Sequence, residues 1–300
     1  MKYALIDMGS NTIRLCVYEV IDSSITKLFQ KKVVAGIAGY VENGVLSQNG
    51  IQAAIDALKD FNQILGLLDI QKVDVFATAS LRNIENQKEA LAQITENTGR
   101  QIEVLSGKQE AILGYYGLVQ EKHPEQGFLV DIGGGSTEIT VFSKEGPQSN
   151  QSYPIGSLNL YKQHVNGHVF PTKNERDAMY ATIGDVFQDA PTRYKGMKNC
   201  TLYAVGGSAR AILRIANHHF RNEEDNTQIQ RKQIKELRKY LEKKGQDRID
   251  LIIKYCPERF HTIIPGLMIL ETLSKKFGAD CIDVCSGGVR EGYLLNKKHI

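Results

Sequence analysis

The chain has 300 residues, of which 42% are hydrophobic and 24% charged, and it contains no tryptophan. At about 150 residues per domain this length predicts two domains, and the composition excludes a disordered, collagenous or coiled-coil protein. The formal net charge of +3 is too small for a general nucleic-acid-binding surface.

The N-terminus predicts a strand over residues 3–7, a turn of small polar residues, and a second strand over residues 13–18. The same order returns with a strand over residues 128–131, a glycine-rich turn and a strand over residues 138–142. Asp131 follows Asp7 by 124 residues at the end of the corresponding strand. A repeat this long indicates a duplicated domain and not a solenoid.

Helices and strands alternate between and after the two copies, which predicts α/β layers. The polar segment 121–127 precedes the second copy, so we place the boundary there, with domains over residues 1–125 and 126–300. A polar, mobile loop is expected over residues 218–227. Helices are predicted over residues 51–68, 86–99, 106–119, 172–188, 230–244 and 266–277, and strands over residues 73–77, 102–105, 202–205 and 281–285.

The two turns have the composition of phosphate-binding loops. Successive backbone N–H groups without a Cβ in the way form a concave array for phosphate oxygens. Asp7 and Asp131 could hold a divalent cation or orient a water molecule. A simple hairpin turn would explain one such sequence, whereas two copies favour phosphate binding. The predicted phosphate-binding residues of the turns are Gly9, Ser10, Asn11, Thr12, Gly133, Gly134, Gly135, Ser136 and Thr137.

Further positions carry groups that could act on a bound phosphate. Arg82 follows a strand end and could clamp a phosphate, although a solvated surface arginine explains it as well. Glu138 also has two interpretations, as a residue that contacts the ligand or as a residue on the surface of its strand. Glu110 lies in the first turn of its helix, where a carboxylate also complements the helix dipole. Gly207 and Ser208 lie where a strand enters a helix, so their N–H groups would point at a ligand.

Two other features have plainer interpretations. The helix over residues 230–244 carries seven basic side chains. A track for a polyanion is one interpretation, but Glu236 and Glu242 interrupt it, and a solvated helix face is favoured. His218 and His219 lack Cys or carboxylate neighbours at ligand spacing and are assigned to the loop. The five cysteines include no CxxC pair, which favours reduced thiols.

Together these motifs resemble the exopolyphosphatase and guanosine pentaphosphate phosphohydrolase family. The resemblance implies two ribonuclease-H-like α/β domains of the actin-like ATPase superfamily that flank a cleft. It also implies the short form of the family, with a last helix that often crosses back to the first domain. The segments that carry it run in order along nearly the whole chain, at residues 7–12, 78–82, 106–111, 131–138, 206–210, 258–259, 265–266 and 287–292.

The resemblance also implies roles for individual residues. Glu110 corresponds to the catalytic base that activates water, and Arg82 to a phosphate-contacting arginine. Asp131 and Glu138 correspond to the acidic pair near the metal. Asp7, at the end of the corresponding strand of the first copy, is predicted from its position alone as a third metal ligand. Residues 33–36 depart from the family pattern, because an arginine that would help to hold a polyanion is missing there.

We therefore expect an Mg²⁺-dependent exopolyphosphatase, with Mn²⁺ as a substitute metal and guanosine pentaphosphate as a second substrate. The halves are expected to close around the phosphate, with a hinge at residues 121–127. Alternatives are a sugar or acetate kinase of the same superfamily, or a sensor that binds polyphosphate or nucleotide without turnover. Asp7 interrupts the apolar N-terminus before a secretory segment can form. We expect a cytoplasmic homodimer without nucleic-acid or membrane partners.

Overall fold

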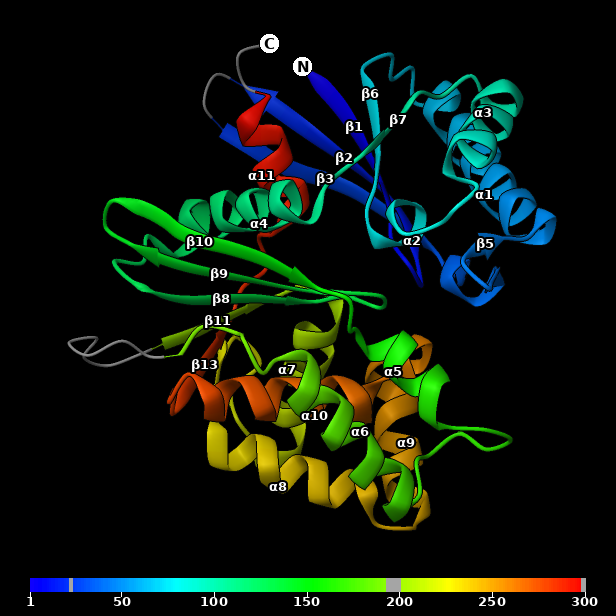
Figure 1. Ribbon diagram of the computed structural model, residues 1–300. Coiled ribbons are helices and arrows are strands. Elements are labelled where there is room, and N and C mark those ends of the chain that lie inside the picture. Colours follow the sequence, from blue (N-terminus) through cyan, green and yellow to red (C-terminus); the bar gives the residue numbers. More distant parts are fainter. Residues whose placement is uncertain (22–23, 193–200, 298–300) are drawn as a thin grey trace. The chain divides into compact units, whose positions relative to one another are not determined.

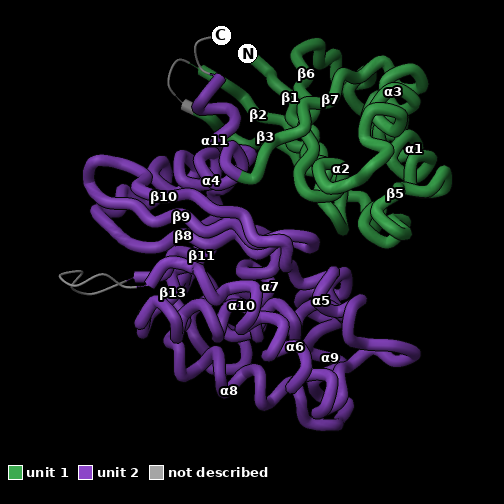
Figure 2. The backbone as a smooth tube through the Cα atoms, in the orientation of Figure 1, with its two compact units in different colours: residues 1–107 green, residues 108–300 purple. Residues whose placement is uncertain are grey.

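The computed structural model describes residues 1–21, 24–192 and 201–297. One of the five cysteines, Cys200, lies outside these residues. The chain forms two compact units, residues 1–107 and 108–300 (Figure 2). The segment 121–127 falls inside the second unit, because helix α4 (Gly107–Lys122) groups with the second sheet. The boundary at residue 125 and the hinge in this segment stay predictions.

Unit 1 is built on a mixed five-stranded sheet in the order β3-β2-β1-β6-β7. Strands β1 to β3 pair antiparallel, whereas β6 runs parallel to β1 and β7 parallel to β6. Apolar residues of α1 and α3, among them Leu58 and Ile94, share a core with Ile6 of the sheet. The elements are β1 (Lys2–Met8), β2 (Ile13–Ile21), β3 (Ser24–Val33), η1 (Ile37–Tyr40), β4 (Val41–Glu42), β5 (Val45–Leu46), α1 (Gln48–Leu67), β6 (Val73–Ala77), α2 (Ala79–Arg82), α3 (Gln87–Thr98) and β7 (Ile102–Val104).

Unit 2 is built on a mixed six-stranded sheet in the order β10-β9-β8-β11-β13-β12 (Figure 1). Strands β8, β11 and β13 are parallel, and β9, β10 and β12 are antiparallel to their neighbours. Its remaining elements are β8 (Gly127–Ile132), β9 (Thr137–Ser143), β10 (Gly146–Tyr153), α5 (Ser157–His164), α6 (Lys173–Val186), β11 (Thr201–Val205), α7 (Gly206–Phe220), β12 (Gln228–Gln230), α8 (Arg231–Glu242), α9 (Gln246–Tyr255), η2 (Pro257–Arg259), α10 (Ile263–Lys276), β13 (Cys281–Val284) and α11 (Val289–Asn296).

Strand alternation decides which helices cover each face of the second sheet. Phe128 stacks on Phe277 behind α10, with ring centroids 4.1 Å apart, and belongs to the large core under α6, α7, α8 and α10. Leu129, the next residue, points to the other face and packs with Tyr115 of α4 and Phe142 of β9. Residues at odd positions of β8 therefore share a face with α4 (Figure 1).

The predicted duplication is confirmed in both topology and detail. Strands β1, β2, β3, β6 and β7 occupy the same sheet positions in unit 1 as β8, β9, β10, β11 and β13 in unit 2. Each turn closes with the same backbone bond, from Gly9 N to Thr12 O at 3.0 Å and from Gly133 N to Ser136 O at 2.9 Å. The two turns are thus equivalent structures and not a coincidence of composition.

The largest departures from the predicted elements are at the sheet edges and at the end of α7. Strands β3 and β10 were not anticipated, because both carry many polar and exposed residues. His218 and His219 belong to the last turn of α7 and not to a loop. The ring of His219 packs on Tyr240 of α8, with ring centroids 4.3 Å apart. Among the described residues, no helix has the length and apolarity required to cross a bilayer.

Candidate active site

The second glycine-rich turn rests on the first turn of α5. The N–H groups of Leu158 and Asn159 donate to Gly134 O at 2.9 and 3.0 Å, and the side chain of Asn159 donates to Gly135 O at 2.9 Å. Gly156 permits this approach, because a Cβ there would lie 2.5 Å from the carbonyl carbon of Gly134. Because α5 donates hydrogen bonds to the carbonyl groups of the turn, the amide groups of the turn point away from α5.

Those amide groups are available to a ligand. Within the described residues the N–H groups of Gly134, Gly135 and Ser136 have no protein acceptor. The first turn repeats the pattern, because its carbonyl groups accept from residues 36 and 38. There the side-chain amide nitrogen of Asn11 is buried, and no hydrogen-bond partner for it is found in the described part of the chain. A buried donor without an acceptor is costly unless a ligand supplies one, and a phosphate oxygen would do so.

Asp131 and Glu138 are direct neighbours on one face of the second sheet. They are register partners across β8 and β9, and partners in an antiparallel pair point to the same side. Glu138 is 3% exposed, and its Oε1 accepts a hydrogen bond from Ser152 at 2.7 Å. Gly206 makes room for Asp131, because a Cβ there would lie 2.1 Å from Oδ1 and its φ of +88° already disfavours other residues.

Glu110 begins the helix that covers this face. It is 8% exposed in the first turn of α4. Thr140, two residues after Glu138 and therefore on the same face, donates from its hydroxyl to the carbonyl of Ala111 at 3.3 Å. Three predicted acidic residues of unit 2, Asp131, Glu138 and Glu110, are thus on the α4 side of the sheet. Sequence spacing alone could not establish this.

The third predicted phosphate motif of the chain, the Gly206–Ser208 turn in unit 2, lies against an arginine. Arg259 of η2 donates from Nη1 to Ser208 Oγ at 3.0 Å, and a Cβ on Gly207 would lie 2.0 Å from its Nη2. Ser157 connects this turn to the glycine-rich turn, since its hydroxyl donates to Gly133 O at 3.2 Å and lies 3.5 Å from Ser208 Oγ. The predicted residues Gly207 and Ser208 are therefore next to Gly133.

Arg259, which contacts this turn, also acts on His261. Burial lowers the pKa of His261, and the positive charges of Lys162 and Arg259 lower it further. Burial also lowers the pKa of Lys162. Both shifts favour the neutral forms of these two groups, whereas a nearby anion would favour their charged forms.

Unit 1 holds the remaining predicted residues. Arg82 ends the short helix α2 after β6, and its Nη1 donates to Leu105 O at 3.1 Å, just after β7. Its guanidinium is therefore at the carboxyl ends of two parallel strands, where α/β sheets bind ligands. Asp7 is the register partner of Arg14 across β1 and β2. The first turn thus pairs an acid with a base where the second pairs two acids.

One predicted residue is placed differently, and three were missed. Thr137 is fully buried, and its hydroxyl donates to Ile155 O at 2.6 Å, so this hydroxyl supports the strand end. Gly156, Asn159 and Arg259 shape the site but were not assigned to it. The Gly-x-x-Asn spacing before a helix was the available signal for the first two. Arg259 is 51 residues from Ser208 in the chain, so no local spacing could connect them.

The acidic pair fits a divalent cation that is shared with phosphate. Within the residues that the structure describes, no group of three His, Cys, Asp or Glu side chains could hold a metal ion. Magnesium commonly takes one or two carboxylates and completes its shell with waters and substrate phosphates. Asp131 and Glu138, adjacent on β8 and β9, supply that donor set without a closed protein cage.

The fold and the turns together define a class of protein. Two mixed sheets of the same topology, each with a strand–turn–strand unit, form the actin-like, ribonuclease-H-like α/β fold. A family model described as the Ppx/GppA phosphatase family matches residues 16–299. The chain belongs to this family and is a hydrolase.

Relatives and solved structures agree with this assignment. A Haemophilus influenzae protein whose name proposes an exopolyphosphatase is 27% identical over 98% of this chain and 91% of its own length. A Vibrio cholerae guanosine-5'-triphosphate,3'-diphosphate pyrophosphatase is 26% identical over 97% of this chain, which spans 58% of that relative. An exopolyphosphatase structure from Cytophaga hutchinsonii has a TM-score of 0.84 at 22% identity and covers 99% of this chain and 97% of its own. The Aquifex aeolicus Ppx/GppA family member has a TM-score of 0.79 at 23% identity over 100% and 98%. Both structures share the fold.

Proposed function

We propose that this protein removes the terminal phosphoryl group of inorganic polyphosphate and accepts guanosine pentaphosphate as a second substrate. The observation that carries the proposal is the pair of equivalent turns. Apart from the closing bonds of Gly9 and Gly133, the backbone amides of these turns have no acceptor among the described residues, while neighbouring segments hold the carbonyls of the turns. Such arrays bind chained phosphates through main-chain donors and need no base or sugar. The names of the two relatives point to the same two substrates.

Phosphoryl transfer requires little covalent chemistry from a protein, so positioning and charge neutralisation are its main tasks. In this proposal the turns position the phosphates, and Arg82 and Arg259 neutralise their charge. Glu110 accepts a proton from the attacking water, because it is a buried carboxylate on the face that holds the acidic pair. Asp131 and Glu138 would hold a divalent cation, with Asp7 proposed as a further contact. When bound, that ion would withdraw charge from phosphate oxygens.

A kinase would transfer the phosphoryl group to an acceptor, and a sensor would not transfer it at all. Membership in a phosphatase family favours hydrolysis over both. The presence of Glu110 also favours turnover over a sensor, because a binding protein has no use for a general base. Water is then the only acceptor that the proposal requires.

The proposal is tested by phosphate release from tripolyphosphate, long-chain polyphosphate and guanosine pentaphosphate, each with Mg²⁺. We expect Glu110→Gln to lower kcat by about 10²–10⁴-fold with little change in phosphate affinity, since a general base contributes that much. Glu96→Gln in α3 makes the same change at an exposed position of unit 1 and should keep full activity. Near-normal turnover by Glu110→Gln would show that Glu110 is not the general base. If the wild-type protein releases no phosphate from any of the three substrates, the proposed reaction is refuted.

A further inference from the structure

Helix α8 and the residue that caps its C-terminus present a row of four unpaired lysines to solvent. Lys232, Lys235 and Lys239 of α8 and the cap residue Lys243 are all exposed, and at 3.6 residues per turn the three helical lysines fall within an arc of about 60° on the helix surface. No ion pair involves any of them within the described residues. The opposite side of α8 is buried in the core through Ile234, Leu237 and Leu241. The lysine row, defined by these four residues, is therefore the outer side of a firmly anchored helix.

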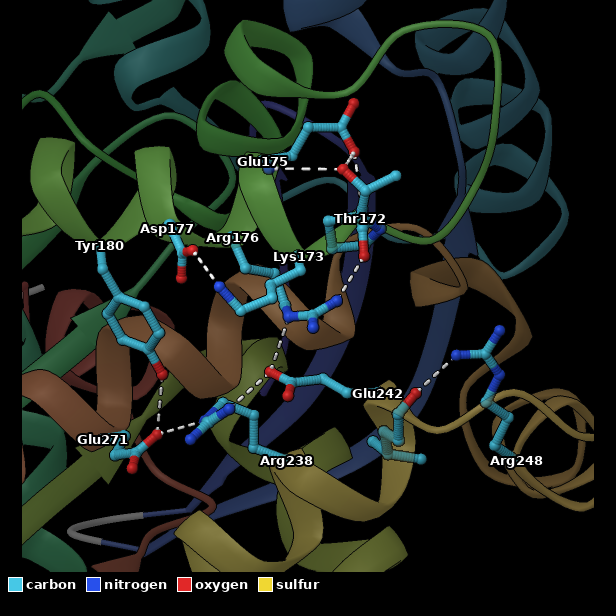
Figure 3. A network of polar contacts seen from close by, with 12 residues as sticks. Thr172, Lys173, Glu175, Arg176, Asp177, Tyr180, Arg238, Glu242, Arg248 and Glu271 are labelled. Atoms are coloured by element: carbon cyan, nitrogen blue, oxygen red, sulfur yellow. Dashed lines mark hydrogen bonds and ion pairs between the residues drawn. The ribbon is translucent and has the colours of Figure 1, made fainter.

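The two acidic residues of this helix do not interrupt the lysine row. Glu242 is 13% exposed in its side chain and accepts from Arg238 Nη1 at 2.6 Å and from Arg176 Nε of α6 at 3.2 Å (Figure 3). Arg238 also binds Glu271 of α10 at 2.5 Å. Glu242 thus belongs to a shielded network beside the row. Glu236 is on the other flank, where its charge acts on His219.

The lysine row concentrates charge on a protein that otherwise lacks it. Residues 231–244 contain seven basic and two acidic side chains, a net charge of +5, while the whole chain has a net charge of +3. The rest of the chain is therefore slightly negative. Four unpaired like charges within three turns repel one another, and a polyanion laid along them would relieve that repulsion.

The side chains of the lysine row favour a polyanion that has no nucleobases. The aromatic residue of α8, Tyr240, packs on His219 with ring centroids 4.3 Å apart. Proteins that bind single-stranded nucleic acid combine positive charge with aromatic side chains for stacking. A membrane-surface helix would need an apolar face at the interface, and here that face is in the core. Lysine ammonium groups act as point charges and suit phosphate without fixed geometry.

A neighbouring cavity does not extend the row. This hollow of about 460 Å³ is lined by residues of α7, α8 and α9. Two of its lining residues, Arg221 and Lys254, are cationic, but Asp247 and Asp250 line it too. Its charge is balanced, so it would not attract a polyanion, and the four lysines alone carry the inference.

Helix α7 connects the lysine row to the proposed site within unit 2. Its N-terminus forms the Gly206–Ser208 turn, and its last turn carries His219 beside α8. Fifteen residues of helix separate these ends, a distance of about 22 Å. We propose that the lysine row holds the distal part of a long polyphosphate chain whose terminal phosphates occupy the turns. This inference rests on the proposed function and makes the row a determinant of chain length.

The test compares two fourfold variants of the full chain. The first replaces Lys232, Lys235, Lys239 and Lys243 by Gln. The control replaces four exposed lysines of unit 1, Lys2, Lys59, Lys72 and Lys88, by Gln, with the same change in net charge. For the row variant we expect kcat/KM for long-chain polyphosphate to fall about tenfold, as for the loss of several exposed charge contacts. Its kcat/KM for tripolyphosphate should stay within about twofold, because that substrate is too short to reach the row.

A second measurement separates this inference from the proposed reaction. Binding of labelled long-chain polyphosphate is measured at about 50 and 200 mM salt, with single-stranded RNA as competitor. Fewer lysine contacts should flatten the salt dependence of the row variant but not of the control. Equal losses in both variants, an unchanged row variant, or RNA that binds the row as strongly as polyphosphate would each overturn the inference. A wild-type protein that binds polyphosphate through the row but releases no phosphate would refute the proposed reaction alone.

Discussion

Arg14 and Glu138 occupy the same position in the two copies of the strand–turn–strand unit. Each is the register partner of the aspartate that precedes its turn, Asp7 in unit 1 and Asp131 in unit 2. An acid facing a base is balanced, whereas two adjacent acids repel and gain from a shared cation. We therefore expect a single residue in each copy to decide whether its turn binds a metal.

We expect Glu138→Gln to raise the Mg²⁺ concentration needed for half-maximal activity by about tenfold or more, because it removes one of two anionic ligands. The measurement is phosphate release over an Mg²⁺ titration. Glu145→Gln changes the same charge on an exposed residue that follows β9 and should leave the titration unchanged. An unaltered Mg²⁺ dependence in Glu138→Gln would exclude this carboxylate from the metal site.

At the scale of the element, α5 positions the glycine-rich turn through contacts that no side-chain motif reveals. Three of its backbone N–H groups and the Asn159 side chain hold the turn's carbonyls. The turn's own sequence predicts flexibility, since three glycines follow each other, yet the helix fixes its amides in one direction. Preorganised donors of this kind bind more strongly than donors that must first be ordered.

Gly156→Ala tests this support. The added methyl would lie 2.5 Å from Gly134 C and 2.7 Å from Gly135 N, so the turn must shift. We expect kcat/KM to fall by up to about 10²-fold, the effect of a displacement of about 1 Å, while the protein remains folded. Gly184→Ala is the matched control, because its Cβ meets open space within α6. It should raise the thermal midpoint slightly and leave kinetics unchanged, and equal kinetics in both variants would contradict the role of α5.

Helix α6 offers a test of pH dependence at its N-terminus. The pKa of Glu175 is lowered to about 2, chiefly by the hydrogen bond from the backbone N–H of Thr172 and further by its interaction with His168. A carboxylate whose pKa is lower in the folded state stabilises the fold above its ordinary pKa of about 4.5 and loses that effect as pH falls toward 2. The stability difference between wild type and Glu175→Gln should therefore be largest above about pH 5 and shrink below about pH 4.5.

Urea unfolding of both proteins across this pH range measures the difference. Asp177→Asn is the control in the same helix, because Asp177 is an exposed partner of Lys173. Its difference from wild type should stay small at every pH. A Glu175→Gln difference that does not change with pH would mean that the Thr172 bond is equally strong with a neutral acceptor.

At the scale of the whole molecule, the duplication was visible in the sequence because each copy repeats an aspartate, a turn and a strand at a constant offset. Many of the strands and helices around them followed from apolar periodicity, but the helices α5, α9 and α11 did not. The edge strands β3 and β10 could not be predicted in this way, because their many polar residues do not alternate regularly with apolar ones. Contacts such as Arg259 with Ser208, or Thr140 with Ala111, depend on how distant segments pack, and no single-sequence pattern encodes them.

Because each unit carries one phosphate turn, we expect a bound phosphate chain to draw the two units together, as in other two-domain enzymes that complete their site by closure. Small-angle scattering with and without a slowly hydrolysed polyphosphate analogue and Mg²⁺ measures this. The radius of gyration should decrease at saturating ligand. Inorganic phosphate alone, which occupies one turn, serves as the control, and an unchanged radius with the analogue would argue against closure.

The use of main-chain amides in both turns has a consequence for inhibitor resistance. A side chain that contacts a drug can be exchanged by one mutation, but a backbone N–H is removed only by proline. Proline is also disfavoured directly before these amides, because at Gly9 or Gly133 it would remove the donor of the bond that closes the turn. A phosphate mimic held by these amides would therefore meet few escape mutations that leave the enzyme active. Resistance would have to arise in the surrounding supports, such as Gly156, where changes also weaken the natural substrate.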